Sequence, residues 1–394
     1  MHTENVLICG AGIAGPALAY WLDRYGYAVT VVERAPAPRP GGQAVDFKGA
    51  THRTVLERMG IWEEIHARRT GTTDTVFVDE HGQRLAFMSG DFTGGDVEIL
   101  RGDLSRIMYE RTAARCEYVF GDTVTALTDT EGGVRVEFER GAARTFDLVF
   151  GADGIHSRVR RLAFGPEREF VRHLGHYYCV AGASPWSTTA AGSRERATAH
   201  GYNTPGRLAV SGGPKAQQLY LFTAPELDYA RDDVASQRRI VTEAYAGLGW
   251  QVPRMLEEMA AFDDFYLDSL SRVDMAKSGY TRGRVALVGD SGYGNTLGGF
   301  GTGLAVVGAY VIAGELALHD DHTVAFANYD AIMRRYAKIA GRSNAGRFLA
   351  PKTGYGIALR NRFLESPLWR LMSKYSDDAS NDIELRDYPQ LVAP

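Results

Sequence analysis

The chain has 394 residues, of which 45% are hydrophobic and 23% are charged, and its formal net charge is −4. This length suits two or three domains with a large core, and the composition is ordinary for a globular protein. The slight acidity argues against the basic surface that attracts nucleic acids or anionic membranes. We therefore predict no nucleic-acid partner and no membrane partner, and the oligomeric state stays open.

The three cysteines, Cys9, Cys116 and Cys179, are isolated and odd in number, which is typical of a reducing compartment. No basic segment followed by an apolar run precedes the first predicted strand, so we expect no signal peptide. The longest apolar stretch, 304–312, is shorter than the roughly 20 residues that span a bilayer. It is predicted as a buried helix, and the protein is predicted to be cytoplasmic.

The chain begins with a strand, a glycine-rich turn, a helix over 15–25 and a second strand. Gly10, Gly12 and Gly15 follow the first apolar run, and Glu33 ends the next one. Glycines at this spacing let the backbone turn tightly and approach a pyrophosphate, and an acidic residue about 20 positions on accepts ribose hydroxyls. Since Glu33 would repel a 2′-phosphate, FAD or NAD is expected rather than NADP.

The rest of the chain alternates between strand-like and helix-like segments. After a loop over 35–49, helices are expected at 50–59, 62–67, 104–114, 233–247, 302–318, 323–348 and 360–375. Strands are expected at 75–78, 84–88, 97–100, 118–120, 123–127, 134–138, 146–150, 177–183, 207–211, 218–223 and 284–288, the first three in a second sheet. The pattern predicts an α/β protein whose Rossmann-like nucleotide domain is discontinuous. That domain is expected to cover 1–72, 97–172 and 274–318, a mixed α/β substrate domain 73–96 and 173–273, and a helical segment 319–394.

Three further motifs narrow the nucleotide. They are Arg-Gly-Asp-Leu at 101–104, Gly-Ala-Asp-Gly-Ile-His-Ser-Arg-Val-Arg at 151–160 and Gly-Asp-Ser-Gly-Tyr at 289–293. Together with the opening glycines and Glu33 they resemble the four-part pattern of the FAD-dependent aromatic hydroxylases, the p-hydroxybenzoate hydroxylase family of group A flavoprotein monooxygenases. The loop over 41–49 is similar to that of the compact branch of tetracycline-inactivating flavin monooxygenases.

The resemblance implies a tightly bound FAD and roles for each motif. Arg101 is expected to reach a phosphate or the ribityl oxygens, and Asp290 the ribityl chain. The glycine-rich run 298–304 would turn a helix N-terminus toward the flavin pyrimidine edge. The residues expected to bind the cofactor are Gly10, Ala11, Gly12, Ile13, Ala14, Gly15, Glu33, Arg34, Gln43, Ala44, Asp46, Arg101, Thr125, Asp153, Gly154, Asp290, Gly301 and Thr302.

Some of these motifs have a second interpretation. Arg101 could instead pair with Asp103 on a solvated helix start, and Asp153 could cap the following helix. The arginines at 158, 160 and 161 suit the phosphates of NAD(P)H, yet a solvated helix face explains them equally well. The chain also departs from the family, because Ser291-Gly292-Tyr293 stands where Ala-Ala-His is usual and no proline precedes the glycines. A looser loop beside the flavin is therefore expected.

The resemblance implies that NADPH or NADH reduces FAD and that O2 then adds at flavin C4a. The hydroperoxide would hydroxylate an aromatic or polyketide-like small molecule. Because the flavin carries the chemistry, we assign no catalytic side chain, and His173 and His176 lack the further ligands of a metal site. Pocket-lining residues are expected among Tyr178, Tyr220, Phe222 and Trp186. A reductase or dehydrogenase of the same fold and a catalytically idle FAD-binding protein stay open as alternatives.

Overall fold

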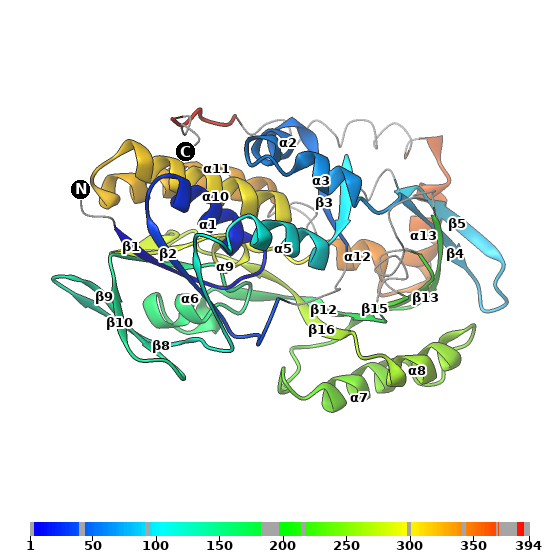
Figure 1. Ribbon diagram of the computed structural model, residues 1–394. Coiled ribbons are helices and arrows are strands. Elements are labelled where there is room, and N and C mark those ends of the chain that lie inside the picture. Colours follow the sequence, from blue (N-terminus) through cyan, green and yellow to red (C-terminus); the bar gives the residue numbers. More distant parts are fainter. Residues whose placement is uncertain are drawn as a thin grey trace.

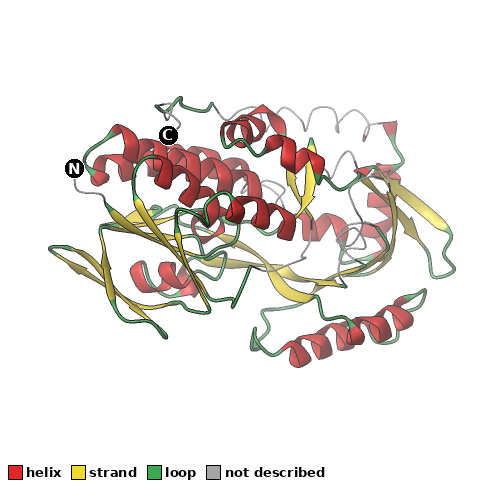
Figure 2. Cartoon of the chain, in the orientation of Figure 1, coloured by secondary structure: helices red, strands yellow, loops and turns green. Residues whose placement is uncertain are grey.

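The computed structural model describes residues 4–38, 44–90, 95–182, 197–213, 217–297, 301–340, 344–367, 369 and 384–389. Figures 1 and 2 show strands and helices arranged around two large sheets, with the first sheet near the N-terminus and the second at the other end of the molecule. The α/β fold class is thus confirmed. The proposed domain boundaries stay a prediction.

The first sheet has six strands in the order β17-β18-β11-β1-β2-β7. These are Thr281–Arg282, Val285–Leu287, Leu148–Gly151, Asn5–Cys9, Ala28–Glu33 and Glu117–Phe120. All neighbours except β17 and β18 run parallel. The strand order reverses at β1, which lies between β2 and β11, and ligands of such sheets bind outside the carboxyl ends of the strands at this point.

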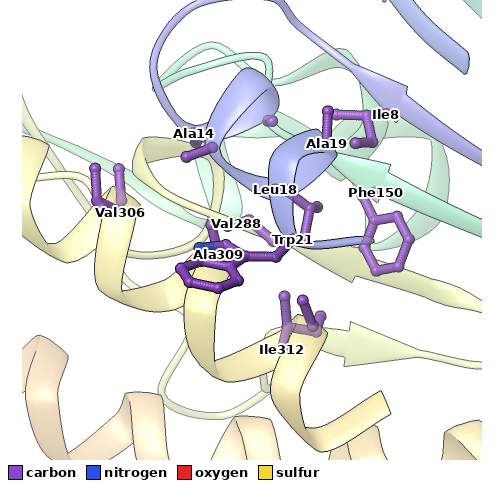
Figure 3. Close-up of a cluster of buried hydrophobic side chains, with 14 of the residues drawn as sticks. Ile8, Ala14, Leu18, Ala19, Trp21, Phe150, Val288, Val306, Ala309 and Ile312 are labelled. Carbon is purple, nitrogen blue, oxygen red and sulfur yellow. The ribbon is translucent and has the colours of Figure 1, made fainter. Parts of the chain in front are cut away.

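Two buried helices cover one face of this sheet. Helix α1 (Ala14–Arg24) packs on α10 (Gly301–Leu318), and α11 (His322–Ala340) lies behind α10. Figure 3 shows Trp21 and Leu18 of α1 close to Ala309 of α10. Within the described residues, only α10 is long and apolar enough to cross a membrane, and 78% of that stretch is buried, as in a core helix.

Smaller elements connect the strands of the first sheet. A three-stranded unit is formed by β8 (Val124–Thr130), β9 (Gly133–Phe138) and β10 (Arg144–Phe146), and α6 (Arg158–Ala163) follows β11. The remaining elements are β3 (Ala44–Phe47), α2 (Gly49–Arg58), α3 (Trp62–Ala67), β6 (Val97–Leu100), α5 (Arg101–Glu110), η1 (Glu167–Glu169) and α9 (Asp290–Tyr293). The expectation that 97–100 joins the second sheet was wrong, because β6 pairs with β3.

The second sheet has seven strands in the order β16-β12-β15-β14-β13-β4-β5. These are Phe265–Val273, Val171–Ala181, Gln218–Thr223, Arg207–Ser211, Ala197–Thr204, Thr73–Val78 and Arg84–Met88. Helices α7 (Val234–Tyr245) and α8 (Val252–Ala261) lie below it in Figure 1. The helix expected over 323–348 is two helices, α11 and α12 (Ala345–Leu349), and α13 (Gly354–Leu364) starts earlier than expected.

Candidate active site

The turn after β1 can be built only with glycine at two positions. Gly10 has a φ of 110°, and a Cβ on it would stand 2.4 Å from the carbonyl oxygen of Ala152. A Cβ on Gly15 would stand 1.9 Å from the carbonyl oxygen of Gly10. The tight turn lets α1 begin at Ala14, so that the unpaired N–H groups of its first turn face the crevice at the sheet edge.

Glu33, at the end of β2, is held against this turn. Its Oε2 accepts a hydrogen bond from the backbone N–H of Ala11 at 2.8 Å, and its Oε1 accepts one from Ala35 at 2.8 Å. Each carboxylate oxygen keeps a second lone pair, which suits ribose hydroxyls. The neighbouring candidates Arg34 and Thr125 are both exposed.

Arg101 and Asp290 contribute two unpaired charges to the same edge of the sheet. Nη2 of Arg101 lies 3.8 Å from where a Cβ on Gly12 would stand, and Oδ1 of Asp290 lies 3.3 Å from the corresponding point on Gly301. Both side chains are exposed, and neither forms a hydrogen bond or ion pair with any described residue. The predicted alternative, an Arg101–Asp103 pair, is wrong, since Asp103 pairs with Arg106.

Protein atoms surround the Asp290 carboxylate although solvent reaches the side chain. Protein atoms crowd the carboxylate and raise its pKa, while the Arg101 guanidinium lowers it. A free guanidinium suits a phosphate, and a free carboxylate suits sugar or ribityl hydroxyls. Together with the glycine turn and Glu33, these groups fit a dinucleotide such as FAD.

Asp153 is engaged as a helix cap. Its carboxylate accepts hydrogen bonds from the backbone N–H of Arg158 at 2.6 Å, from that of Val159 at 3.1 Å and from the Ser157 hydroxyl. The cap interpretation therefore describes this side chain. Gly154 has a φ of 79° and open space where a Cβ would stand, so the backbone of the motif, more than its carboxylate, is available to a ligand.

The three arginines after this motif are occupied by the protein itself. Arg160 is fully buried and donates to the carbonyl oxygens of Ser291 at 2.7 Å and Ile155 at 2.6 Å. Arg161 pairs with Glu167 at 3.0 Å, and Arg158 lies 3.7 Å from Glu139. Arg160 therefore fits neither a free cluster for NAD(P)H phosphates nor a solvated helix face, whereas Arg158 and Arg161 lie at the surface in ion pairs and their role stays a prediction.

His156 belongs to a network that the sequence did not reveal. Its Nδ1 lies 2.9 Å from Oε1 of Glu167, and its Nε2 lies 3.0 Å from Oδ1 of Asp268 on β16. The Tyr266 hydroxyl donates to Asp268 at 2.8 Å. Burial by itself lowers the pKa of His156, but the two carboxylates outweigh burial and raise it. Asp268 lies 112 positions away in the chain, so no local motif could have signalled the contact.

Tyr178 connects the second sheet to the charged groups of the first. Its ring centroid lies 5.7 Å from that of Tyr266. Burial raises the pKa of Tyr178, the charges of Asp268 and Asp290 raise it further and Arg101 lowers it, so the Tyr178 hydroxyl lies within electrostatic range of Asp290 and Arg101. This aromatic pair on the seven-stranded sheet therefore faces the site at the edge of the first sheet.

Tyr220 and Phe222 lie on the opposite face of the seven-stranded sheet. Tyr220 pairs with Cys179 and Leu221 with Tyr178 across β12 and β15, and successive side chains of a strand point to opposite faces. Tyr220 and Phe222 pack in the core under α7, with the Tyr220 ring centroid 5.0 Å from that of Tyr245. The prediction that they line the substrate pocket was wrong, and Trp186 lies outside the described residues.

The remaining predicted positions frame the site. Ala44 and Asp46 lie on β3, where Asp46 accepts a hydrogen bond from the backbone N–H of Gly95 at 3.3 Å. Gly301 and Thr302 begin α10. Gln43 and the segment 298–300 lie outside the described residues.

The departures from the family pattern are packed tightly where they are described. Ser291 donates to the carbonyl oxygen of Gly151 at 2.5 Å, and Tyr293 is buried beside Tyr329. A Cβ on Gly308 of α10 would stand 1.9 Å from the Tyr293 hydroxyl. The described part of this segment is therefore part of the core and not a loose loop.

Comparison with known proteins decides the family. Residues 3–323 match the family described as FAD binding domain. The chain belongs to this family. It is 41% identical to an uncharacterized Mycobacterium tuberculosis protein over 83% of this chain and 89% of that protein, and 34% identical to a flavin-dependent monooxygenase of Legionella longbeachae over 84% and 85%.

A solved structure extends the likeness over nearly the whole molecule. The tetracycline destructase Tet(51) superposes with a TM-score of 0.80, at 30% identity, over 98% of this chain and 99% of that chain. The group A resemblance is thus confirmed. The protein is a FAD-dependent monooxygenase, and such enzymes act on a small molecule with O2 and a reduced nicotinamide.

Proposed function

We propose that this monooxygenase hydroxylates a planar, polycyclic polyketide-like aromatic molecule, with tetracyclines as the first compounds to test. The observation that supports this most is the pair Tyr178 and Tyr266 beside Arg101 and Asp290. Flat aromatic substrates stack on exposed rings, and in this pair Tyr266 is 39% exposed while the buried Tyr178 ring supports it. The relation to Tet(51), whose name denotes tetracycline destruction, favours a substrate with several fused rings.

The protein side chains have supporting tasks. When bound, reduced FAD supplies the activation of O2, while the chain binds, orients and excludes water. We assign the pyrophosphate to the first turn of α1 and to Arg101, a ribose to Glu33, and the ribityl hydroxyls to Asp290. The Tyr266 hydroxyl is already bonded to Asp268, so its ring is fixed as a platform.

The deciding experiment measures NADPH and NADH oxidation with tetracyclines and with single-ring phenols under 18O2. We expect a tetracycline product carrying one 18O atom. Nicotinamide consumption with a reduced, unlabelled product would instead identify a reductase, and labelling of single-ring phenols alone would contradict the polycyclic substrate. The same assay shows whether NADPH or NADH is the better reductant. We also propose that the enzyme is cytoplasmic.

A pair of tyrosine variants on one sheet provides a matched comparison. Tyr178→Leu is expected to raise KM for the aromatic substrate about tenfold, because the buried Tyr178 ring supports the exposed Tyr266 ring on which the substrate would stack. Tyr220 is buried against Tyr245 on the opposite face of the sheet, so Tyr220→Phe is expected to leave KM unchanged. Equal KM values for Tyr178→Leu and the unmodified enzyme would contradict the assignment of this face to substrate.

A further inference from the structure

His52 of α2 is a buried histidine with an unused hydrogen-bonding atom. Its ring is 2% exposed. Nδ1 accepts a hydrogen bond from the backbone N–H of Lys48 at 3.2 Å, so a neutral ring carries its proton on Nε2. Burial lowers the pKa of His52 to about 4, which keeps the ring neutral at pH 7. The Nε2 atom is shielded from solvent and has no hydrogen-bond partner among the residues that the structure describes.

The imidazole lies directly against the first turn of α10. A Cβ on Gly303 would stand 2.1 Å from Cε1 and 2.2 Å from Nε2 of His52, so only glycine fits beneath the ring. The N–H groups in the first turn of a helix have no carbonyl partner in that helix. The Nε2–H of His52 therefore lies beside the free backbone N–H groups that begin α10. Gly301, in the same turn, lies next to the Asp290 carboxylate.

A set of donors without a cation suits a polar acceptor that is neutral or only partly charged. In FAD the pyrophosphate is matched by α1 and Arg101, and the sugar hydroxyls by Glu33 and Asp290. The acceptors left over are the carbonyl oxygens of the flavin pyrimidine ring, and a helix N-terminus favours the negative charge that this ring gains on reduction. We propose that His52 binds FAD by donating its Nε2–H to a pyrimidine carbonyl oxygen of the flavin.

This inference rests on the proposed placement of FAD along the site, and the chain offers a control for it. His176 is equally buried, at 1% exposure, and its Nε2 is also shielded from solvent. Its ring lies on a glycine as well, since a Cβ on Gly346 would stand 2.7 Å from Cγ of His176. Gly346, however, belongs to α12 on the seven-stranded sheet and not to the start of α10.

The test compares FAD binding with apoprotein stability. In His52→Leu the apoprotein loses a buried donor that has no partner, and it also loses the acceptor of the Lys48 N–H, so its Tm is expected to change little. Its Kd for FAD, measured by quenching of flavin fluorescence, is expected to rise about tenfold, and the flavin midpoint potential to fall. His52→Gln keeps a donor and should stay within about threefold of the unmodified Kd, and His176→Leu should leave the Kd and the potential unchanged.

Two results would overturn the inference. One is a His52→Leu protein with unchanged Kd and potential, and the other is a lower apoprotein Tm with unchanged Kd, which identifies a purely structural histidine. If His52→Leu does not fold, the infrared bands of 13C-labelled flavin carbonyls are compared between the unmodified protein and His52→Met, which also lacks a donor, and identical frequencies count against the hydrogen bond. Failure of the unmodified apoprotein to bind FAD would instead remove the site assignment itself.

Discussion

The Nε2 atom of His156 lies 3.0 Å from Oδ1 of Asp268 and so joins the turn after β11 to the seven-stranded sheet. The same ring contacts Glu167 through Nδ1 at 2.9 Å. One histidine from the cofactor motif thereby fixes the strand that carries Tyr266, the neighbour of Tyr178. The contact sets the position of the aromatic face relative to the FAD site.

This contact predicts a defined pH dependence of stability. Because the pKa of folded His156 is raised, its contribution is complete below its unfolded pKa, about 6.5, and is lost as the pH rises through the folded value. The pKa of Glu167 is lowered to about 2 and that of Asp268 is also lowered, so their contribution is complete above about pH 4.5 and is lost as the pH falls through the folded values. The network is therefore strongest between about pH 4.5 and 6.5.

His156→Gln is expected to lower the free energy of unfolding by about 1.5–3 kcal/mol in that window, and by less at pH 9. Thermal unfolding between pH 4.5 and 9 measures the difference. His81→Gln, in the exposed turn between β4 and β5, serves as the control with no expected effect. A deficit for His156→Gln that grows with rising pH would refute the assignment of the charges.

Asp290→Asn is expected to weaken FAD retention. The carboxylate is free within the described residues, and a hydrogen bond to a charged acceptor contributes about 1.5–3 kcal/mol, which corresponds to a tenfold to hundredfold rise in Kd. The measurement is flavin content after extensive dialysis, together with Kd. Asp103→Asn, which removes only the surface pair with Arg106, should retain FAD fully. Equal flavin content in both variants would argue against a role for Asp290.

Gly15→Ala tests the tight turn before the cofactor. The new Cβ would stand 1.9 Å from the carbonyl oxygen of Gly10, so β1 and α1 must separate, at a cost of roughly 1–3 kcal/mol or more. We expect a lower Tm and loss of FAD. Gly132→Ala has no atom within 4 Å of its Cβ and should behave as the unmodified protein. Normal FAD binding by Gly15→Ala would show that the turn tolerates widening.

The features that the sequence predicted are those encoded locally. The glycine turn, Glu33 and Asp290 lie at the carboxyl ends of β1, β2 and β18, and parallel strands bring these ends to one edge, whereas Arg101 reaches the same edge from the end of β6 in the separate β3–β6 pair. The misjudged pair, Tyr220 and Phe222, shows the limit of such patterns. Both faces of the seven-stranded sheet are apolar, so alternation could not tell the helix-covered face from the one beside the cofactor site.

Long-range pairings were beyond the sequence for a different reason. His156 meets Asp268 only because β16 runs beside β12, and β6 pairs with β3 rather than with β5. Neither partner can be identified from the local sequence pattern around the residue. The tightly packed Ser291 and Tyr293 likewise depend on distant groups, namely Gly151 and Tyr329.

The C-terminal segment 384–389 is bound to the core through a buried carboxylate. Glu315 of α10 is fully buried, and its Oε1 accepts hydrogen bonds from Arg386 at 3.0 Å and from the Tyr388 hydroxyl at 2.8 Å. Asn328 donates to Oε2 at 2.9 Å. The Tyr388 ring lies on Gly314, where a Cβ would stand 2.2 Å from the ring.

Tyr388→Phe is expected to lower the free energy of unfolding by about 1.5–3 kcal/mol, because the buried carboxylate loses one charge-assisted hydrogen bond while the ring still fits over Gly314. Urea unfolding measures the loss. Tyr355→Phe, at a residue that is 80% exposed on α13, provides the control and should unfold at the urea concentration of the unmodified protein. Since α10 also begins at the cofactor site, Tyr388→Phe should release FAD at a lower urea concentration as well. Coincident urea unfolding curves for Tyr388→Phe and Tyr355→Phe would show that the segment adds nothing to the stability of α10.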